Sequence, residues 1–232
     1  MKRKRIGILG GISYKSAIRY YELILRKYYE RTKDYYYPEI VIFSLNFQKF
    51  TDLEIKNREK YINYIIEGIT ALENAGAEFV IMAANSPHAV FGEVEKRSTV
   101  PLLSIVAVTA EEAYQHTMKT LLLLGIKFTM QSSFYQNVCR KYGINVVVPT
   151  LPEQDEINRI IFDELVIGVI KEESKERLLQ IINTYEVDGV ILGCTELPLI
   201  LNQTDTEKPL LDTVELHAKA ALNHSLLNKQ SF

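Results

Sequence analysis

The chain has 232 residues, of which 47% are hydrophobic and 24% are charged. This composition is typical of a soluble globular protein, and the length suffices for one domain or two small ones. The formal net charge of −2, from 27 basic and 29 acidic residues, provides no general attraction to nucleic acid or to a membrane. We therefore expect neither as a partner.

No stretch of the sequence approaches the ~20 apolar residues of a transmembrane helix, and no convincing signal peptide precedes the first aliphatic run. The two cysteines, Cys139 and Cys194, are far apart in the sequence. Distant cysteines without an export signal favour a reducing compartment over a disulfide scaffold. The predicted location is the cytoplasm.

Short aliphatic runs alternate with helix-like segments, which predicts an α/β protein with mostly parallel sheets buried on both faces. A helix is predicted over Lys56–Ala75, and Gly76 follows it at the position where glycine commonly ends a helix. The strand candidates, in chain order, are Arg5–Gly10, Glu39–Ser44, Glu78–Ala83, Leu102–Ser104, Thr120–Leu124, Asn145–Val148 and Gly189–Gly193.

One motif occurs twice, as AEFVIMAANSPH at 77–88 and as VDGVILGCTELP at 187–198. Each copy runs from an acidic residue through an aliphatic strand to a small residue. The next position is Ala84 in the first copy and Cys194 in the second. Only the second copy therefore offers a thiol at the end of its strand.

The repeat extends to the strands IGILGG at 6–11 and LLLLGI at 121–126. It predicts two similar subdomains related by pseudo-twofold symmetry, each a mostly parallel four-stranded sheet flanked by helices. We expect the active site in the cleft between them. The last helix is expected to return to the first subdomain, so the predicted domains are 1–103 plus 212–232, and 104–211.

Cys194 follows an aliphatic strand and precedes Thr195, where the sequence suggests the start of a helix. Open α/β sheets bind ligands at the carboxyl ends of their strands, and a helix N-terminus would stabilise a thiolate there. Cys194 is thus a candidate acid/base group. The alternative is that it is buried as a small apolar residue. Core packing is expected for Cys139, which lies in a helix-like stretch.

Asn85 and Ser86 follow the strand of the first copy, and either of them could cap a helix with Pro87 in its first turn. The helix N-terminus would bind a carboxylate, but capping alone also explains these residues. The glycine turn at 10–11 and the following Ser13 do not form a dinucleotide motif. A turn that admits a small carboxylate fits better, with Thr129 in the matching place. No metal-ligand spacing is present, so no metal is predicted.

Five stretches resemble the aspartate/glutamate racemase family, the cofactor-independent amino-acid racemases, in matching order along nearly the whole chain. They are GILGGIS (7–13), MAANSPH (82–88), LLGIKFTM (123–130), ILGCTELP (191–198) and LLDTVELHA (210–218). The resemblance implies two subdomains that close around an amino acid, and commonly a homodimer. It also implies that two cysteines act on opposite faces of the α-carbon, with no pyridoxal phosphate or metal.

Cys194 matches the second cysteine of this family, whereas Ala84 stands where the first cysteine belongs. Alanine neither accepts nor donates a proton, so a symmetric two-thiol mechanism is excluded for this chain. The resemblance implies that the substrate is held by the following residues: Gly11, Ser13, Asn85, Ser86, Thr129 and Thr195.

The sequence as a whole predicts a racemase of aspartate and/or glutamate, needing no cofactor and using Cys194 as acid/base. A member impaired by Ala84 that only binds amino acids is one alternative, and a one-cysteine decarboxylase of the same superfamily is another. A dicarboxylic substrate also calls for a cation. Some aspartate racemases place a lysine where Val166 aligns, and the cations available here are Lys15, Lys49, Arg58 and Lys127.

Overall fold

The computed structural model describes residues 3–227 and contains two compact units. Unit 1 extends to Ile105 and resumes at His217, and unit 2 comprises Val106–Leu216. The sequence predicted domain boundaries after residue 103 and before residue 212. That these boundaries separate independently folding domains stays a prediction.

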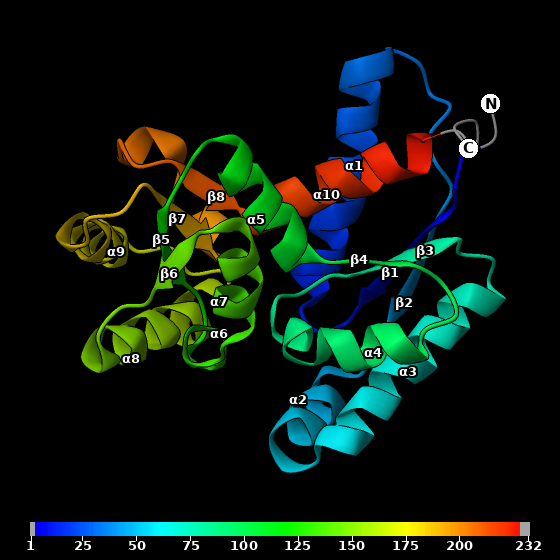
Figure 1. Ribbon diagram of the computed structural model, residues 1–232, viewed down its shortest axis with the longest axis horizontal. Helices are drawn as coiled ribbons and strands as arrows, with labels where there is room; N and C mark the ends of the chain where they lie inside the picture. The colour runs from blue at the N-terminus through cyan, green and yellow to red at the C-terminus, as the bar shows by residue number, and fades with distance from the viewer. Residues whose placement is uncertain (1–2, 228–232) are drawn as a thin grey trace. The chain divides into compact units, whose positions relative to one another are not determined.

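Unit 1 contains a four-stranded parallel sheet in the order β2-β1-β3-β4. Helices α1 and α10 lie on one side of this sheet, and α3 and α4 lie on the other (Figure 1). The strands are β1 (Ile6–Gly10), β2 (Ile40–Ser44), β3 (Phe79–Met82) and β4 (Leu102–Leu103). The helices are α1 (Tyr14–Thr32), α2 (Phe47–Lys56), α3 (Arg58–Asn74), α4 (Phe91–Arg97) and α10 (Thr213–Leu226), which begins in unit 2.

Unit 2 contains a second four-stranded parallel sheet, in the order β6-β5-β7-β8. A short π-helix, Ile161–Leu165, extends α8. The strands are β5 (Thr120–Leu124), β6 (Asn145–Val147), β7 (Gly189–Leu192) and β8 (Leu210–Asp212). The helices are α5 (Ile105–Gln115), α6 (Lys127–Gln131), α7 (Phe134–Cys139), α8 (Leu151–Ile160) and α9 (Glu172–Thr184).

These two sheets confirm the predicted α/β fold with four parallel strands in each half. All seven predicted strands are present, most of them slightly shorter than expected. The eighth, β8, was not predicted, because it is only three residues long and α10 begins immediately after it. The predicted helix over Lys56–Ala75 is corrected to α3, since Asn57 caps it and separates it from α2. Gly76 has φ +88°, as a glycine beyond a helix C-terminus should.

Each unit has an apolar core that reaches the end of the repeated motif. In unit 1, α3 packs Ile65 and Ile69 against strand residues that include Val80, and the same cluster contains Ala84. The core of unit 2 is formed mainly by α8 and α9 against β5 and β7, and it contains Cys194. Burying each large aliphatic side chain contributes about 1.5–3 kcal/mol, so these cores hold the motif ends in place.

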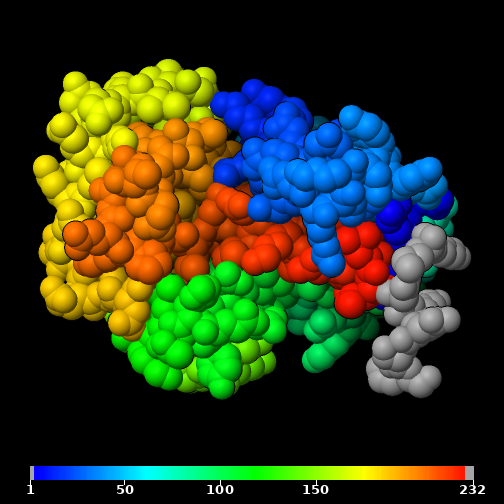
Figure 2. Space-filling model, turned by 90° about the horizontal axis from the view of Figure 1, so that it is seen from above, coloured from blue at the N-terminus to red at the C-terminus, as the bar shows by residue number. Residues whose placement is uncertain are grey.

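The helices α1 and α10 run side by side on the surface of unit 1 (Figure 2). Two side-chain hydrogen bonds join them, from Arg31 to Asn223 (3.2 Å) and between Tyr20 and His217 (2.8 Å). From His217 onward α10 belongs to unit 1.

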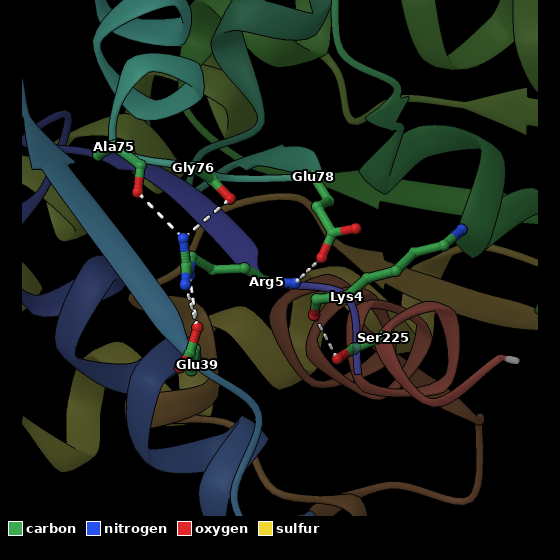
Figure 3. A network of polar contacts seen from close by, with 7 residues as sticks. All are labelled: Lys4, Arg5, Glu39, Ala75, Gly76, Glu78 and Ser225. Carbon is green, nitrogen blue, oxygen red and sulfur yellow. Dashed lines mark hydrogen bonds and ion pairs between the residues drawn. The ribbon is translucent and has the colours of Figure 1, made fainter. Parts of the chain in front are cut away.

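The acidic residue at the start of each motif copy holds the beginning of a neighbouring strand. Glu78 accepts a hydrogen bond from the Arg5 backbone N–H at 3.0 Å, and the Arg5 guanidinium binds Glu39 (Figure 3). Asp188 accepts from the backbone N–H groups of Lys119 (2.7 Å) and Thr120 (2.8 Å), which lower the pKa of its carboxyl. Both acidic residues thus have a structural role.

Within residues 3–227, no helix combines the length and the apolar character that crossing a membrane requires.

Candidate active site

Parallel strand pairing brings two sequence motifs to one sheet edge in each unit. In unit 1, Leu9 of β1 lies opposite Met82 of β3, so the turn after β1 adjoins the turn that contains Ala84. In unit 2, Leu124 of β5 lies opposite Leu192 of β7, which places the turn after β5 beside Cys194. Both turns lie at the carboxyl ends of parallel strands, where α/β sheets bind ligands.

The turn after β1 requires glycine. Gly11 has φ +82°, and an added Cβ would lie 2.2 Å from the Leu45 carbonyl oxygen. Ser13 occupies the N-cap position of α1, but its side chain makes no capping hydrogen bond. Glycine at residue 11 is thus explained by its positive φ and by the close approach of the Leu45 backbone.

The Ala84 turn is held by buried polar side chains. Ser16 donates a hydrogen bond to the Ala83 carbonyl. His88 Nδ1 lies 3.1 Å from the Ala84 carbonyl oxygen, and His88 Nε2 accepts from the Ile105 N–H at 3.2 Å. The imidazole therefore carries its proton on Nδ1 and is neutral. Burial, together with the neighbouring His217, lowers the pKa of His88 to about 3.

Asn85 does not cap a helix in the way that the sequence suggested. A short 3₁₀ helix, Ser86–Val90, follows the Ala84 turn, with Asn85 at its N-cap position and Pro87 in its first turn. The Asn85 side chain makes no capping hydrogen bond there. Capping therefore does not explain the place of Asn85 at this strand end, and both Asn85 and Ser86 are buried there.

Ser86 instead belongs to a hydrogen-bonded cluster with Glu54 of α2 and Tyr61 of α3. Tyr61 Oη donates to Glu54 Oε1 at 2.8 Å, and Ser86 hydrogen-bonds with both residues. Burial raises the pKa of the Glu54 carboxyl, and the bonds from Tyr61 and Ser86 oppose that effect. Burial also raises the pKa of the Tyr61 hydroxyl, and the Glu54 charge adds to this. A carboxyl group thus reaches the Ala84 turn from a separate helix.

Cys194 is buried, and its thiol donates a hydrogen bond to Glu196 Oε2 at 3.1 Å. The Thr195 hydroxyl donates to the same oxygen at 2.6 Å. Burial raises the pKa of the Cys194 thiol well above its ordinary value, and the Glu196 charge raises it further. The resting cysteine is accordingly a thiol.

The sequence-based expectation of a helix N-terminus that stabilises the Cys194 thiolate is wrong. The residues after Glu196 form only a three-residue 3₁₀ turn, Leu197–Leu199. Backbone hydrogen bonds from Thr195 and Glu196 do lower the pKa of the thiol, but burial and the carboxylate outweigh them. Burial has the largest effect on the pKa of Cys194, and the Glu196 charge acts in the same direction.

Thr129 lies in α6 with its side chain against Gly193, the residue before Cys194. Its Cγ2 would be 3.5 Å from a Cβ added at Gly193. Thr129 is 0% exposed, and its hydroxyl oxygen has no hydrogen-bond partner. An unsatisfied buried hydroxyl costs about 1–3 kcal/mol, and no residue of the described chain supplies a partner for this one.

The remaining sequence-based assignments have mixed outcomes. Cys139 is fully buried in α7, which confirms its core position, and burial raises the pKa of its thiol to about 11. Lys49 lies over the Tyr64 ring, Arg58 pairs with Glu93, and Lys127 pairs with Asp155. Val166 is half-buried and directly follows the π-helix.

Sequence reasoning missed two residues of the site, Glu196 and Glu54. Glu196 lies two positions after the cysteine, and the acidic residue in CTELP could have indicated a partner for the thiol. Glu54 lies 30 or more residues from the Ala84 turn on a separate helix, so only the folded structure connects it to Ser86. Along the described chain, no three His, Cys, Asp or Glu side chains are grouped so as to hold a metal ion.

Residues 9–221 match the family model described as Asp/Glu/Hydantoin racemase. The chain belongs to this racemase family. It is 28% identical over 228 residues to the broad specificity amino-acid racemase RacX of Bacillus subtilis, covering 94% of this chain and 96% of that protein. The match confirms the resemblance seen in the sequence and makes the protein an enzyme of the racemase class.

Solved structures of related proteins agree with the family. An aspartate racemase homologue from Pyrococcus horikoshii is 39% identical and superposes with a TM-score of 0.86, covering 97% of this chain and 99% of that one. The aspartate racemase of Picrophilus torridus is 26% identical, with a TM-score of 0.79 and coverage of 96% and 94%. Both structures therefore superpose on this racemase over nearly its full length.

Proposed function

We propose that this protein racemises aspartate and/or glutamate without a cofactor, and that Cys194 exchanges the proton on one face of the α-carbon. The observation that carries the proposal is the hydrogen bond from the Cys194 thiol to Glu196. It gives a buried thiol at the end of a parallel strand an adjacent acceptor for its proton. Family membership supports the reaction class, and the aspartate racemase among the related structures supports the substrate.

The Cys194–Glu196 pair generates a thiolate without a change in net charge. At rest the pair has one proton, on sulfur, and one negative charge, on the carboxylate. When that proton moves to Glu196, the sulfur becomes the base and the like-charge repulsion disappears. The thiolate then takes the α-proton of the substrate.

The substrate is held, in this proposal, by polar groups near the two strand ends. The unpartnered Thr129 hydroxyl binds a carboxylate oxygen beside Cys194. Thr195 and the backbone of the Gly11 turn, with Ser13, Asn85 and Ser86, bind the other polar groups of the amino acid. These contacts matter because charge develops on the carboxylate as the α-proton leaves, and fixed donors stabilise such charge.

The proposal is tested by incubating each enantiomer of aspartate and glutamate with the protein, without added cofactor, and resolving the products by chiral chromatography. We expect conversion of at least one pair in both directions. A panel of other amino acids establishes the breadth of the substrate range, as RacX is a broad specificity racemase. If no amino acid is racemised while substituted malonates lose carbon dioxide, the racemase proposal is wrong and the decarboxylase alternative is correct.

A homodimer and a cytoplasmic location belong to the same proposal. Helix α1 exposes Tyr14, Ile18 and Tyr21 at helical spacing, and the edge strand β2 exposes Ile42 and Phe43 in the same unit. Exposed apolar side chains of this kind suit contact with a second copy. Both cysteines are free, as expected in a reducing compartment. Sedimentation equilibrium tests the dimer, and a single-chain mass would contradict it.

A further inference from the structure

We propose that Glu54, acting through the Ser86 hydroxyl, supplies the proton for the α-carbon face that Ala84 is unable to serve. The inference rests on the proposed racemase function and deepens it. It replaces the missing first thiol with a carboxyl–hydroxyl relay that belongs to unit 1. Ser86 would contact the substrate, and Glu54 would act through it.

The geometry of three elements supports the relay. Glu54 is half-buried on α2, Tyr61 is 2% exposed on α3, and Ser86 is 7% exposed beside the Ala84 turn. Tyr61 Oη lies 2.8 Å from Glu54 Oε1, and Ser86 hydrogen-bonds with both side chains. The Glu54 carboxyl is therefore oriented by Tyr61 and connected to the second residue after Ala84.

Other groups at this turn are unsuited to proton transfer. Both ring nitrogens of His88 are engaged, Nδ1 with the Ala84 carbonyl and Nε2 with the Ile105 N–H. The Asn85 amide does not titrate in the working range, and burial holds the Tyr61 hydroxyl protonated. Burial raises the pKa of Glu54, which makes its acid form more abundant near neutral pH. Among the titratable groups bonded to this turn in the described chain, Glu54 fits the role.

The proton balance of one turnover is simple. The Cys194 thiolate takes the α-proton, which breaks the Cα–H bond and leaves its electron pair on the substrate. Ser86 gives its hydroxyl proton to the opposite face of Cα and receives the carboxylic proton of Glu54. Cys194 ends as a thiol, Glu196 as a carboxylic acid that holds the original thiol proton, and Glu54 as a carboxylate. Loss of the Glu196 proton to water and uptake of one proton from water by Glu54 restore the starting state. The opposite enantiomer runs the same steps in reverse, with the carboxylate as base and the thiol as acid.

The experiment measures inversion and retention separately in Glu54→Gln, which keeps the shape and hydrogen-bonding capacity of the side chain. Each enantiomer of the substrate is incubated in deuterium oxide, and α-deuteration and configuration are determined together. We expect racemisation to fall about 10²-fold or more. The rate of Cys194-dependent α-deuteration with retention should stay within about threefold of that of the unchanged protein. The substitution does not alter the group that serves the Cys194 face of the α-carbon. Asp52→Asn is the matched control on the same helix, where Asp52 is half-exposed and contacts Gln48 and Lys56.

A second variant separates chemistry from folding. Adding Ala84→Cys to Glu54→Gln returns a thiol to the vacant position, and we expect it to restore racemisation by at least about tenfold. A structural defect at Glu54 would not be repaired by a thiol at residue 84. Ser86→Ala should mimic Glu54→Gln, and Glu54→Asp should recover part of the inversion.

Three results would overturn the relay. In the first, Glu54→Gln racemises as fast as the unchanged protein. In the second, it loses retention and inversion in parallel. In the third, the unchanged protein exchanges with retention only, which leaves the Cys194 role intact. A complete absence of Cys194-dependent exchange in the unchanged protein would reject the proposed function, and the relay with it.

Discussion

The Ala84 turn and the Cys194 turn show how two copies of one motif have diverged. Each follows a central parallel strand, belongs to the apolar core of its unit and continues into a short 3₁₀ helix. At the Cys194 turn, a carboxylate from the same motif accepts the thiol proton directly. At the Ala84 turn there is no thiol, and a carboxyl from α2 reaches Ser86. An acid group thus lies beside each turn, whereas only one of the two turns carries a thiol.

The largest expected effect separates the two cysteines. Cys194→Ser should lower α-proton exchange about 10³-fold or more, because the hydroxyl is a far weaker acid than the thiol. Cys139→Ala is the control in the same unit, and its exchange rate should be unchanged since Cys139 is buried in α7. Exchange is followed by NMR in deuterium oxide. Equal loss in both variants would show that the effect is structural.

The role of the carboxylate at the Cys194 turn is tested by Glu196→Gln. We expect the pKa of Cys194 to fall, since the negative charge that raises it is removed. Exchange at neutral pH should nevertheless drop about 10²-fold, because the thiol has lost the acceptor of its proton. Thiolate absorbance measured against pH, in a Cys139→Ala background, checks the first expectation. An unchanged exchange rate would show that Glu196 only packs against the sulfur.

Acid should weaken unit 1 before unit 2. Burial is the main cause that lowers the pKa of His88 to about 3 and of His217 to about 4, and both belong to unit 1. Their folded pKa values lie below the unfolded value of roughly 6.5. Stability is therefore complete above that value and falls as the pH drops toward the folded pKa. Together the two histidines should lower the free energy of unfolding by about 2–3 kcal/mol for each pH unit below about pH 6.

Hydrogen exchange at pH 7 and at about pH 5, corrected for intrinsic rates, measures this difference. Amides of β1 and β3 should lose protection, whereas those of β5 and β7 should retain it. The lowered carboxyl pKa of Asp188 in unit 2 acts only nearer its own titration range, at lower pH. Equal loss in both units would contradict the assignment of the buried neutral histidines.

The smallest expected effect concerns Thr129, which follows β5 in unit 2 as Ser13 follows β1 in unit 1. Thr129→Val removes an unpartnered hydroxyl, so the free energy of unfolding should stay the same or rise by about 1 kcal/mol. The KM for the amino acid should rise about tenfold, as one hydrogen bond to the substrate is lost. Gln136→Met, which removes the other orphaned atom of unit 2, should leave KM unchanged. A loss of stability in Thr129→Val would indicate a structural partner instead.

The sequence predicted most of the fold because both sheets are built from short continuous aliphatic strands. It missed β8, in which two leucines and Asp212 precede a helix, and periodicity is uninformative over three residues. It also identified Cys194 and the Ala84 position from the repeat. The pKa of Cys194 went the other way from the prediction, because burial and a neighbouring carboxylate depend on tertiary packing. Glu54 was beyond reach for the same reason.

The most direct test of the account is α-proton exchange by the unchanged protein, measured by NMR in deuterium oxide with each enantiomer of aspartate and glutamate. Deuterium at the α-carbon with inversion, lost in Cys194→Ser, is the predicted result. It would show that this racemase works with one thiol and a second proton source. Binding of the amino acids without any α-proton exchange would contradict the account.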